Sequence, residues 1–228
     1  MRIIAALVIL LASEFTFAQI QGLPRLPSAG GKALGLQGSI GAGFVDFNVQ
    51  DPKEDFKIDR GMYLVGSIER GFNVAHLYLT LGLSHMTAEG VANYAYANLS
   101  SSHSYAATDV KFKSVVTDLS LGLKMKLIDH YWFRPYIEGG GLGGYQQITY
   151  TSKNAEIGAQ GPDPKTKDVV MGSGYYGEGG MEIMFSDAFG VKLAARQSRY
   201  QTKKMETLGD RALRYSSETY YFALLFGF

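Results

Sequence analysis

The chain has 228 residues, among them 28 Gly, 15 Tyr, 13 Phe and no Cys, and its formal net charge is +1. The absence of Cys excludes a disulfide scaffold, a thiolate metal site and a Cys nucleophile. A hydrophobic content of 46% excludes a disordered chain, and the balanced charge gives no reason to expect a nucleic acid as partner.

The N-terminal segment has the features of a secretory signal peptide. Arg2 precedes an uninterrupted apolar run of ten residues, and small residues near its end suit cleavage after Ala18. A run of this length is too short to span a membrane as a helix. We therefore expect removal of residues 1–18 on export, a flexible periplasmic lead-in over residues 19–33, and a folded domain over residues 34–228.

The folded domain is expected to consist of β-strands, because apolar residues recur at every second position. In Ala75–Ser84, for example, four Leu alternate with polar or small residues. The same pattern, strong or weak, predicts eight strands: Leu36–Val49, Gly61–Glu69, Ala75–Ser84, Val115–Leu127, Tyr131–Tyr150, Val169–Phe185, Phe189–Lys203 and Leu213–Phe228.

The connections between these segments alternate in length. Asp51–Asp59, Thr87–Val110 and Thr151–Asp168 are long and polar, whereas the connections between them are short. Alternation of this kind is typical of an outer-membrane barrel, which has short periplasmic turns and long extracellular loops. A soluble sandwich, the alternative, has no reason to keep its long loops at one end. The sequence therefore predicts an all-β fold, an eight-stranded antiparallel up-and-down transmembrane β-barrel.

The two faces of the predicted strands differ in bulk. One face carries large Leu, Ile, Met and Phe side chains, which suit lipid, while the other carries glycines and charges, which suit a narrow interior. Aromatic residues gather at the strand ends, as two interfacial girdles would require. The girdle at the short turns would comprise Phe72, Tyr131, Trp132, Phe133, Phe185, Phe189, Phe226 and Phe228, and the other Tyr145, Tyr150, Tyr175, Tyr200 and Tyr215.

Charged residues on the inward face are balanced in number, with five of each sign. The cations are Lys124, Lys126, Arg134, Lys192 and Arg196, and the anions are Glu69, Asp118, Glu138, Glu178 and Glu182. Buried charges are costly unless they are paired, and an ion-selective pore would show one sign in excess. The balance predicts a salt-bridged plug, whereas acid/base catalysis is the less favoured interpretation of the carboxylates.

Turn geometry predicts specific neighbours within this network. A turn centred on Asp187 places Glu182 opposite Lys192, and likewise Glu178 opposite Arg196. A two-residue turn at Phe72-Asn73 places Glu69 opposite His76. Opposed residues on paired strands lie about 5 Å apart at Cβ, so each of these pairs is a candidate ion pair.

The predicted signal peptide, the alternating strands and the C-terminal segment Tyr220–Phe228 together resemble outer-membrane proteins of the OmpX and OmpA-barrel type. The resemblance implies a location in the outer membrane of a Gram-negative bacterium, surrounded by membrane lipids. It also implies an assembly signal for the barrel-assembly machinery, carried by the outward aromatic row Tyr220, Phe222, Phe226 and Phe228.

Barrels of similar size include enzymes that modify lipid A, some of which carry a His followed by Ser two residues later. The four histidines are His76, His85, His103 and His130, and none is followed by Ser two residues later. Ser84 and His85 are adjacent in a strand, so their side chains point to opposite faces and form no dyad. We expect no catalytic, cofactor-binding or metal site, and an enzyme is the least favoured class.

The favoured function is that of a non-enzymatic barrel that presents its long loops for surface interaction or envelope integrity. Function concentrates on loops held by a rigid scaffold, so Thr87–Val110, with Tyr94, Tyr96 and Tyr105, and Thr151–Asp168 are the expected contact elements. The alternative is binding or passage of a small hydrophobic molecule, as in OmpW-like barrels. Its basis is an apolar upper interior formed by Val45, Phe47, Tyr63, Val65, Met86 and Leu142.

Overall fold

The computed structural model describes residues 35–49, 55–72, 76–97, 104–128, 132–151, 166–205 and 211–227. The predicted signal peptide and lead-in lie outside these residues, so both remain predictions. Among the described residues, no helix is long and apolar enough to cross a membrane.

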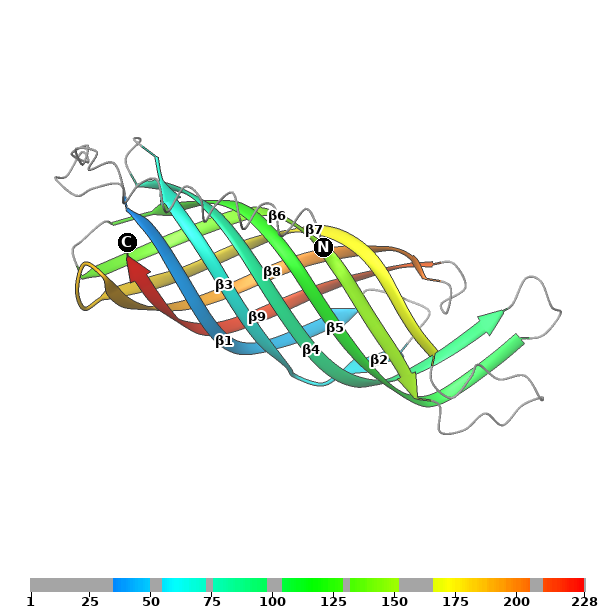
Figure 1. Cartoon of the computed structure of the whole chain (residues 1–228). Helices are drawn as coiled ribbons and strands as arrows, with labels where there is room; N and C mark the ends of the chain where they lie inside the picture. The colour runs from blue at the N-terminus through cyan, green and yellow to red at the C-terminus, as the bar shows by residue number, and fades with distance from the viewer. Residues whose placement is uncertain are drawn as a thin grey trace. The chain divides into compact units, whose positions relative to one another are not determined.

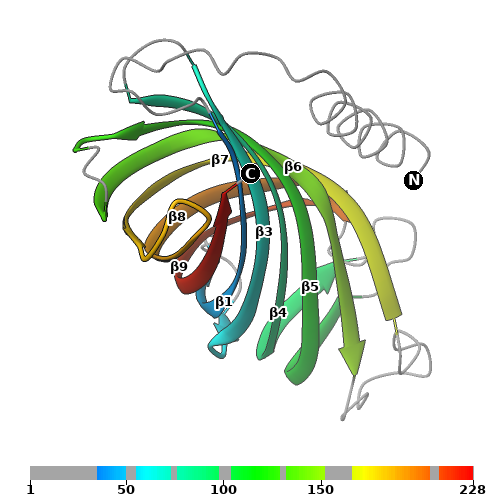
Figure 2. The ribbon, with the colours of Figure 1, turned by 60° about the vertical axis from the view of Figure 1, so that its left-hand side comes forward.

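The described chain forms strands throughout. They are β1 (Leu36–Val49), β2 (Asp55–Ile58), β3 (Gly61–Gly71), β4 (Leu77–Ala97), β5 (Ser104–Lys126), β6 (Phe133–Thr151), β7 (Thr166–Met184), β8 (Phe189–Met205) and β9 (Arg211–Gly227). Eight of them pair in the order β4-β3-β1-β9-β8-β7-β6-β5, and the pairing of β4 with β5 closes the ring (Figures 1 and 2). Every described pairing is antiparallel. The predicted closed barrel of eight antiparallel strands is confirmed.

The short strand β2 was not predicted, since it lies in the segment Asp51–Asp59, whose charged composition predicts a loop. It pairs with Gly90–Asn93 of β4, which follow in the sequence the part of β4 that pairs with β3. Between the two pairings the register shifts by one residue. β2 and β3 therefore serve as one wall strand with an irregularity at Asp59 and Arg60.

The prediction that Thr87–Val110 forms a loop is wrong for most of this segment, which continues β4 and β5. Pairing of β4 with β5 continues to the pair Ala97↔Ser104, with a register shift between Ala92 and Tyr94. The two strands have 21 and 23 residues, whereas about 9–11 residues suffice for a tilted membrane-spanning strand. β4 and β5 thus form a hairpin that extends beyond the other strands, as Figure 1 shows.

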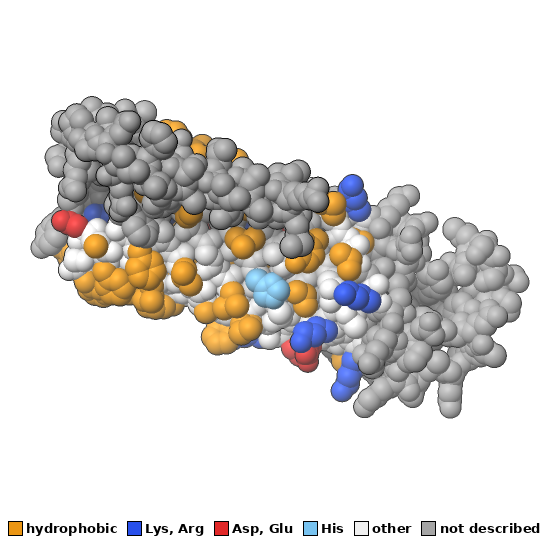
Figure 3. All heavy atoms as spheres, viewed as in Figure 1, with side chains coloured by type: hydrophobic (Ala, Val, Ile, Leu, Met, Phe, Trp, Pro, Cys, Tyr) orange, Lys and Arg blue, Asp and Glu red, His pale blue; other side chains and the backbone are white. Residues whose placement is uncertain are grey.

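The barrel is apolar outside and polar inside. Ile40 is 69% exposed and Leu121 is 56% exposed, whereas Lys124 on the opposite face of β5 is 1% exposed. In Figure 3 hydrophobic side chains cover much of the visible wall, and Lys and Arg gather near the end where β4 and β5 extend. This distribution is the inverse of a soluble barrel, and the closed ring leaves no unpaired strand edge for lipid to contact. The apolar belt therefore lies in a membrane.

The two aromatic girdles are present in part. At the short turns Phe72, Trp132, Phe185 and Phe189 are exposed, and toward the other end Tyr145 and Tyr175 are exposed. Tyr200 and Tyr215 were predicted for the upper girdle, and this is wrong. Both are buried inside the barrel, where their rings stack with centroids 5.1 Å apart. Tyr131 and Phe228, and the side chain of Tyr150, lie outside the described part.

Candidate functional site

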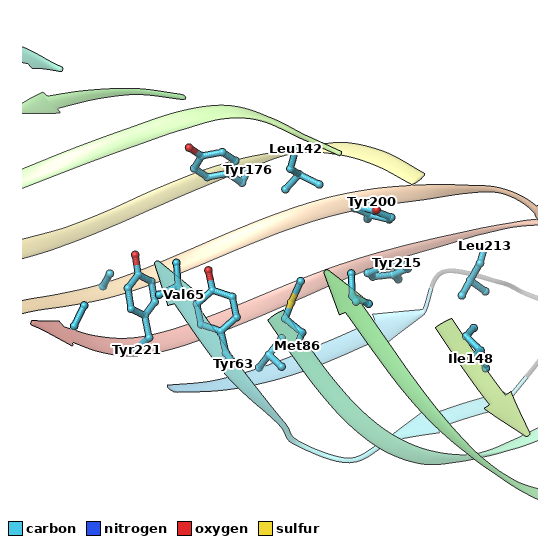
Figure 4. Close-up of a cluster of buried hydrophobic side chains, with 14 of the residues drawn as sticks. Tyr63, Val65, Met86, Leu142, Ile148, Tyr176, Tyr200, Leu213, Tyr215 and Tyr221 are labelled. Atoms are coloured by element: carbon cyan, nitrogen blue, oxygen red, sulfur yellow. The ribbon is translucent and has the colours of Figure 1, made fainter. Parts of the chain in front are cut away.

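The interior of the barrel has two layers. A charged layer lies near the short turns, where β3, β5, β7 and β8 contribute Glu and Lys side chains. An apolar layer lies toward the extended hairpin, and Figure 4 shows its side chains pointing into the lumen from several strands. These two layers decide whether a solute can pass through the barrel.

Two lysines and two glutamates form the centre of the charged layer. Nζ of Lys124 lies 2.5 Å from Oε1 of Glu182 and also pairs with Glu69. Nζ of Lys126 lies 3.2 Å from a carboxylate oxygen of each glutamate. None of these four side chains is more than 5% exposed. Because β3, β5 and β7 are not neighbours in the sheet, the four groups connect the walls across the lumen.

A second cluster is centred on Glu178. Nζ of Lys192 lies 2.9 Å from its Oε1 atom. The hydroxyls of Tyr136 and Tyr221 both donate hydrogen bonds of 2.7 Å to the same oxygen. The ammonium group of Lys192 also lies 5.1 Å from the ring centre of Tyr136. The charge of this buried carboxylate is therefore paired, and its Oε1 atom accepts hydrogen bonds from two hydroxyls.

Arg196 and Glu138 complete the upper boundary of the charged layer. The guanidinium carbon of Arg196 lies 3.7 Å from the ring centre of Tyr176, and Nη1 donates a hydrogen bond of 3.4 Å to Tyr63. Tyr176 and Thr80 donate hydrogen bonds of 2.7 and 2.8 Å to Oε1 of Glu138. Tyrosines therefore separate the charges from the apolar layer above them.

The predicted register of the β7–β8 hairpin is confirmed, but its predicted ion pairs are not the ones formed. Glu182 stands opposite Lys192, and Glu178 stands opposite Arg196. Glu182 instead pairs with Lys124 and Lys126 across the lumen, while Lys192 pairs with Glu178. Long side chains in a narrow interior reach across it as easily as along the wall, and this explains the difference.

The predicted pairing of His76 with Glu69 is wrong. Glu69 stands opposite Thr80 rather than His76, because the connection from β3 to β4 is longer than the predicted two-residue turn. His76 is exposed in this connection and has a φ of 65°, a left-handed conformation typical of turns. It hydrogen-bonds Lys126 there through its backbone carbonyl, which accepts at 2.9 Å.

Asp118 and Arg134 occupy the two ends of the interior. Asp118 is 1% exposed and stands in register between Ser84 and Gly144, in the upper layer and away from the lysines. Arg134 is half-buried near the short turns and stands opposite Glu182. The structure places six of the predicted residues in ion pairs: Glu69, Lys124, Lys126, Glu178, Glu182 and Lys192. Glu138 and Arg196 both contact Tyr176.

The tyrosines that donate hydrogen bonds to the interior carboxylates were missed in the sequence. Tyr136 precedes Glu138 by two residues, and Tyr176 precedes Glu178 by two. Residues two apart in a strand share a face. The alternation that placed the glutamates inside therefore also places these tyrosines inside.

The apolar layer is filled by its own side chains. All six residues of the predicted apolar cup point inward; Val45, Tyr63, Val65, Met86 and Leu142 are buried, and Phe47 packs against them. Val116 at 0% exposure and the stacked Tyr200 and Tyr215 close the space between the walls. No open apolar passage is left between these described residues.

His85 lies on the outward face of β4 and hydrogen-bonds a side chain of the neighbouring strand. Nδ1 of His85 lies 3.0 Å from Oγ1 of Thr117 on the neighbouring strand. Ser84 points inward and is buried, so the two adjacent residues lie on opposite faces, as predicted. Within the described ranges, no group of three or more His, Asp or Glu residues could hold a metal ion.

Solved structures of outer-membrane proteins are among those similar to the chain. No family model matches the chain, and no curated protein is similar to it in sequence. Among solved structures it resembles Neisserial surface protein A, with 10% identity, a TM-score of 0.49, and coverage of 85% of this chain and 97% of that one. It also resembles Ail of Yersinia pestis, crystallised with the heparin analogue sucrose octasulfate, with 9% identity, a TM-score of 0.42, and coverage of 84% and 99%.

A third solved structure similar to the chain is the outer-membrane protease OmpT of Escherichia coli, with 9% identity, a TM-score of 0.44, and coverage of 91% and 99%. The chain is a bacterial outer-membrane β-barrel. Its closed ring, lipid-facing apolar belt and ion-paired interior carry that conclusion. Since one fold serves many functions, the function of this barrel has to be argued from its own residues.

Proposed function

We propose that the barrel is a closed, non-enzymatic membrane anchor that holds the β4–β5 hairpin outside the cell for contact with a macromolecular surface. The observation that carries the proposal is the continuous pairing of β4 with β5 as far as Ala97↔Ser104, on a barrel whose interior is occupied. A scaffold of this kind positions a protruding element without moving a solute.

The interior supports an anchor rather than a channel. Four side chains connect opposite walls through ion pairs: Glu69, Lys124, Lys126 and Glu182. Above them the apolar layer leaves its core residues less than a tenth exposed. The alternative, passage of a small hydrophobic molecule, would require both layers to move apart.

The hairpin has the features of a stiff display element. Beyond Gly90 it adds seven residues to β4, and at about 3.3 Å per residue these project the strand by roughly 20 Å. β2 pairs with Gly90–Asn93 and supports its base. Near the tip, Tyr96 stands opposite Tyr105 in the register. An extension that is hydrogen-bonded along its length costs less entropy to dock than a loose loop does.

The experiment that tests this proposal shortens the hairpin without touching the barrel wall. Replacing Asn93–Asp109 by Asn-Gly joins the register pair Ala92↔Val110 through a two-residue turn. The matched control shortens the segment 152–165, which connects β6 with β7. Gram-negative cells that display each variant at equal levels are scored for adhesion to sister cells, to an epithelial monolayer and to an extracellular-matrix coating.

The expected result is that the parent chain raises adhesion to at least one of these surfaces, and that the shortened hairpin abolishes the gain while the control retains it. Replacement of Tyr96 and Tyr105 by Ala then tests whether the tip carries the contact. Equal adhesion of the parent and the shortened hairpin on all three surfaces would overturn the proposal. Large, long-lived conductance in a planar bilayer would also overturn it, because the anchor would then be a pore.

A further inference from the structure

The outer wall formed by β7, β8 and β9 carries two adjoining grooves. The upper groove has a volume of about 1300 Å³ and is bordered by Arg199, Lys203 and Arg214. The lower groove has a volume of about 600 Å³ and runs over Gly177 and Gly179 toward the apolar belt. Tyr175 and Arg199 line both, so the grooves meet.

The described residues that line the upper groove make it a basic surface. Of the described residues that line it, three are basic and none is acidic. No carboxylate in the described part forms an ion pair with these three cations. On other walls, by contrast, Arg60 pairs with Asp46 at 2.9 Å and Lys113 pairs with Glu89 at 3.6 Å. Within the described residues, the cations of the upper groove therefore have no carboxylate partner and can bind an external anion.

The lower groove has glycines on its floor and apolar side chains along its lower part, while Gln197, Arg199 and Glu218 line its upper edge. A Cβ atom added to Gly177 or Gly179 would meet no atom within 4 Å. Ile137, Tyr175 and Tyr220 form its sides and are 48%, 59% and 56% exposed. Since this wall faces lipid, the lower groove is open to hydrocarbon chains of the membrane.

The two grooves meet at the height of the barrel wall where the outward side chains change from apolar to polar. In the register, Gly179 aligns with Ala195 and Tyr220, whereas two residues higher Gln197 aligns with Glu218. Nη1 of Arg199 donates a hydrogen bond of 3.4 Å to the hydroxyl of Tyr175 at this level. Glu218 disfavours an anion beside it, so the position that suits an anion lies above it, between Arg199 and the other two cations.

We propose that the two grooves together bind one phosphorylated, acylated lipid of the surrounding leaflet. The phosphate lies against Arg199, Lys203 and Arg214, and one acyl chain occupies the groove over Gly177 and Gly179. Arginine and lysine are the side chains that bind phosphate, and the groove below supplies the apolar half of the same amphiphile. The site lies on the membrane-facing wall and does not depend on the hairpin.

The charge requirement is tested with the full chain in nanodiscs of phosphatidylcholine that contain a small fraction of diphosphoryl lipid A. The fraction of protein that carries one lipid A is measured by native mass spectrometry. We expect R199Q/K203Q/R214Q to weaken binding roughly a hundredfold, because each basic residue beside an anionic lipid contributes a factor of about five. The matched control R60Q/K111Q/K113Q removes the same number of charges from other walls and should retain binding.

The acyl requirement is tested by filling the lower groove. G177L and G179L place side chains in open space, and we expect each to weaken lipid A binding about fivefold by excluding the acyl chain from its packing contacts. G141L is the control, since Gly141 also has no atom within 4 Å of an added Cβ but lies outside the lower groove. Heat-modifiable migration on gels verifies that every variant is folded.

Three results would overturn the proposal. The first is an equal loss of binding in the two triple variants, which would indicate a general effect of surface charge. The second is unchanged binding in G177L and G179L, which would remove the acyl half of the site. The third is competition by inorganic phosphate at concentrations comparable to those of lipid A, which would indicate an anion site with no preference for a lipid.

Discussion

Oε1 of Glu178 and Nζ of Lys192 lie 2.9 Å apart, although Lys192 stands opposite Glu182 in the β7–β8 register. Glu182 reaches across the lumen instead, to within 2.5 Å of Lys124 on β5. The interior is therefore connected across the barrel as well as along its wall. Breaking one such contact affects strands that are not neighbours in the sheet.

The first prediction concerns these partnerships. Glu182→Gln leaves two buried lysines with one carboxylate fewer, and should destabilise the barrel by about 3–5 kcal/mol. In double-mutant cycles, Glu182→Gln with Lys124→Met should show a coupling of about 1–3 kcal/mol. The cycle with Lys192→Met should show a clearly smaller coupling. Urea unfolding in lipid vesicles measures both, and a larger coupling with Lys192 would contradict the structure.

The second prediction concerns the hydroxyls around Glu178. Tyr136→Phe and Tyr221→Phe each remove a 2.7 Å hydrogen bond to a buried carboxylate. Each should lower the free energy of unfolding by about 1.5–3 kcal/mol, the range for hydrogen bonds to charged groups. Tyr145→Phe is the control, because Tyr145 is 48% exposed on the lipid-facing side. The same urea assay should give it a change below about 0.5 kcal/mol.

The alternation of inward and outward side chains along each strand correctly predicts most of the residues inside the barrel. The two girdle residues that were predicted wrongly, Tyr200 and Tyr215, are ones to which this rule was not applied. Tyr200 has the same parity as Arg196 in β8, and Tyr215 has the same parity as Tyr221 in β9. Both were assigned to the girdle because they lie near strand ends, although alternation places them inside. Their burial and mutual stacking show that the period of two outweighs the enrichment of aromatics at membrane interfaces.

The length of the β4–β5 hairpin and the ion pairs across the lumen could not be predicted from the alternation of side chains. The segment Thr87–Val110 is rich in Ala, Asn, Ser and Tyr and shows little contrast between its faces. Both faces of a strand outside the membrane meet water, so no contrast is required there, and the pairing of β4 with β5 left no signal. The ion pairs of Glu182 depend on how far β3, β5 and β7 lie from one another. The sequence pattern along one strand does not show how far apart these three strands lie across the lumen.

The third prediction is that the barrel conducts ions poorly. The apolar layer and the ion-paired layer both occupy the lumen, so planar-bilayer recordings should show no large, stable channel. Tyr200→Ala with Tyr215→Ala empties part of the apolar layer but leaves the charged layer in place, and should remain closed. Porin-scale conductance of the parent chain would show that the lumen opens in a membrane.

The fourth prediction concerns assembly. Phe228 lies outside the described residues, but Tyr220 and Phe222 in the same strand are exposed to lipid, as the predicted aromatic row requires. Deletion of Phe228 should leave chains stalled in the periplasm, because the barrel-assembly machinery would lose part of its signal. Cell fractionation and heat-modifiable migration report the outcome. Normal insertion of the shortened chain would show that Phe228 is dispensable.

The last prediction compares two adjacent glycines on opposite faces of β6. A Cβ atom on Gly140 would lie 2.6 Å from the Cα atom of Gly122 in the neighbouring strand, whereas one on Gly141 would meet nothing within 4 Å. Gly140→Ala should therefore push β5 and β6 apart and cost about 1–3 kcal/mol, the usual range for overpacking.

Gly141→Ala should be neutral or stabilising by up to about 1 kcal/mol, because Ala restricts the unfolded chain without straining the folded one. Both substitutions add the same methyl group to the same strand, so the change in strand propensity is the same in both variants. Urea unfolding of the two variants in the same vesicles isolates the effect of the face. If Gly141→Ala proved the more damaging, Gly141 rather than Gly140 would face the crowded interior, and the inward assignment of Glu138 and Leu142 on β6 would be wrong.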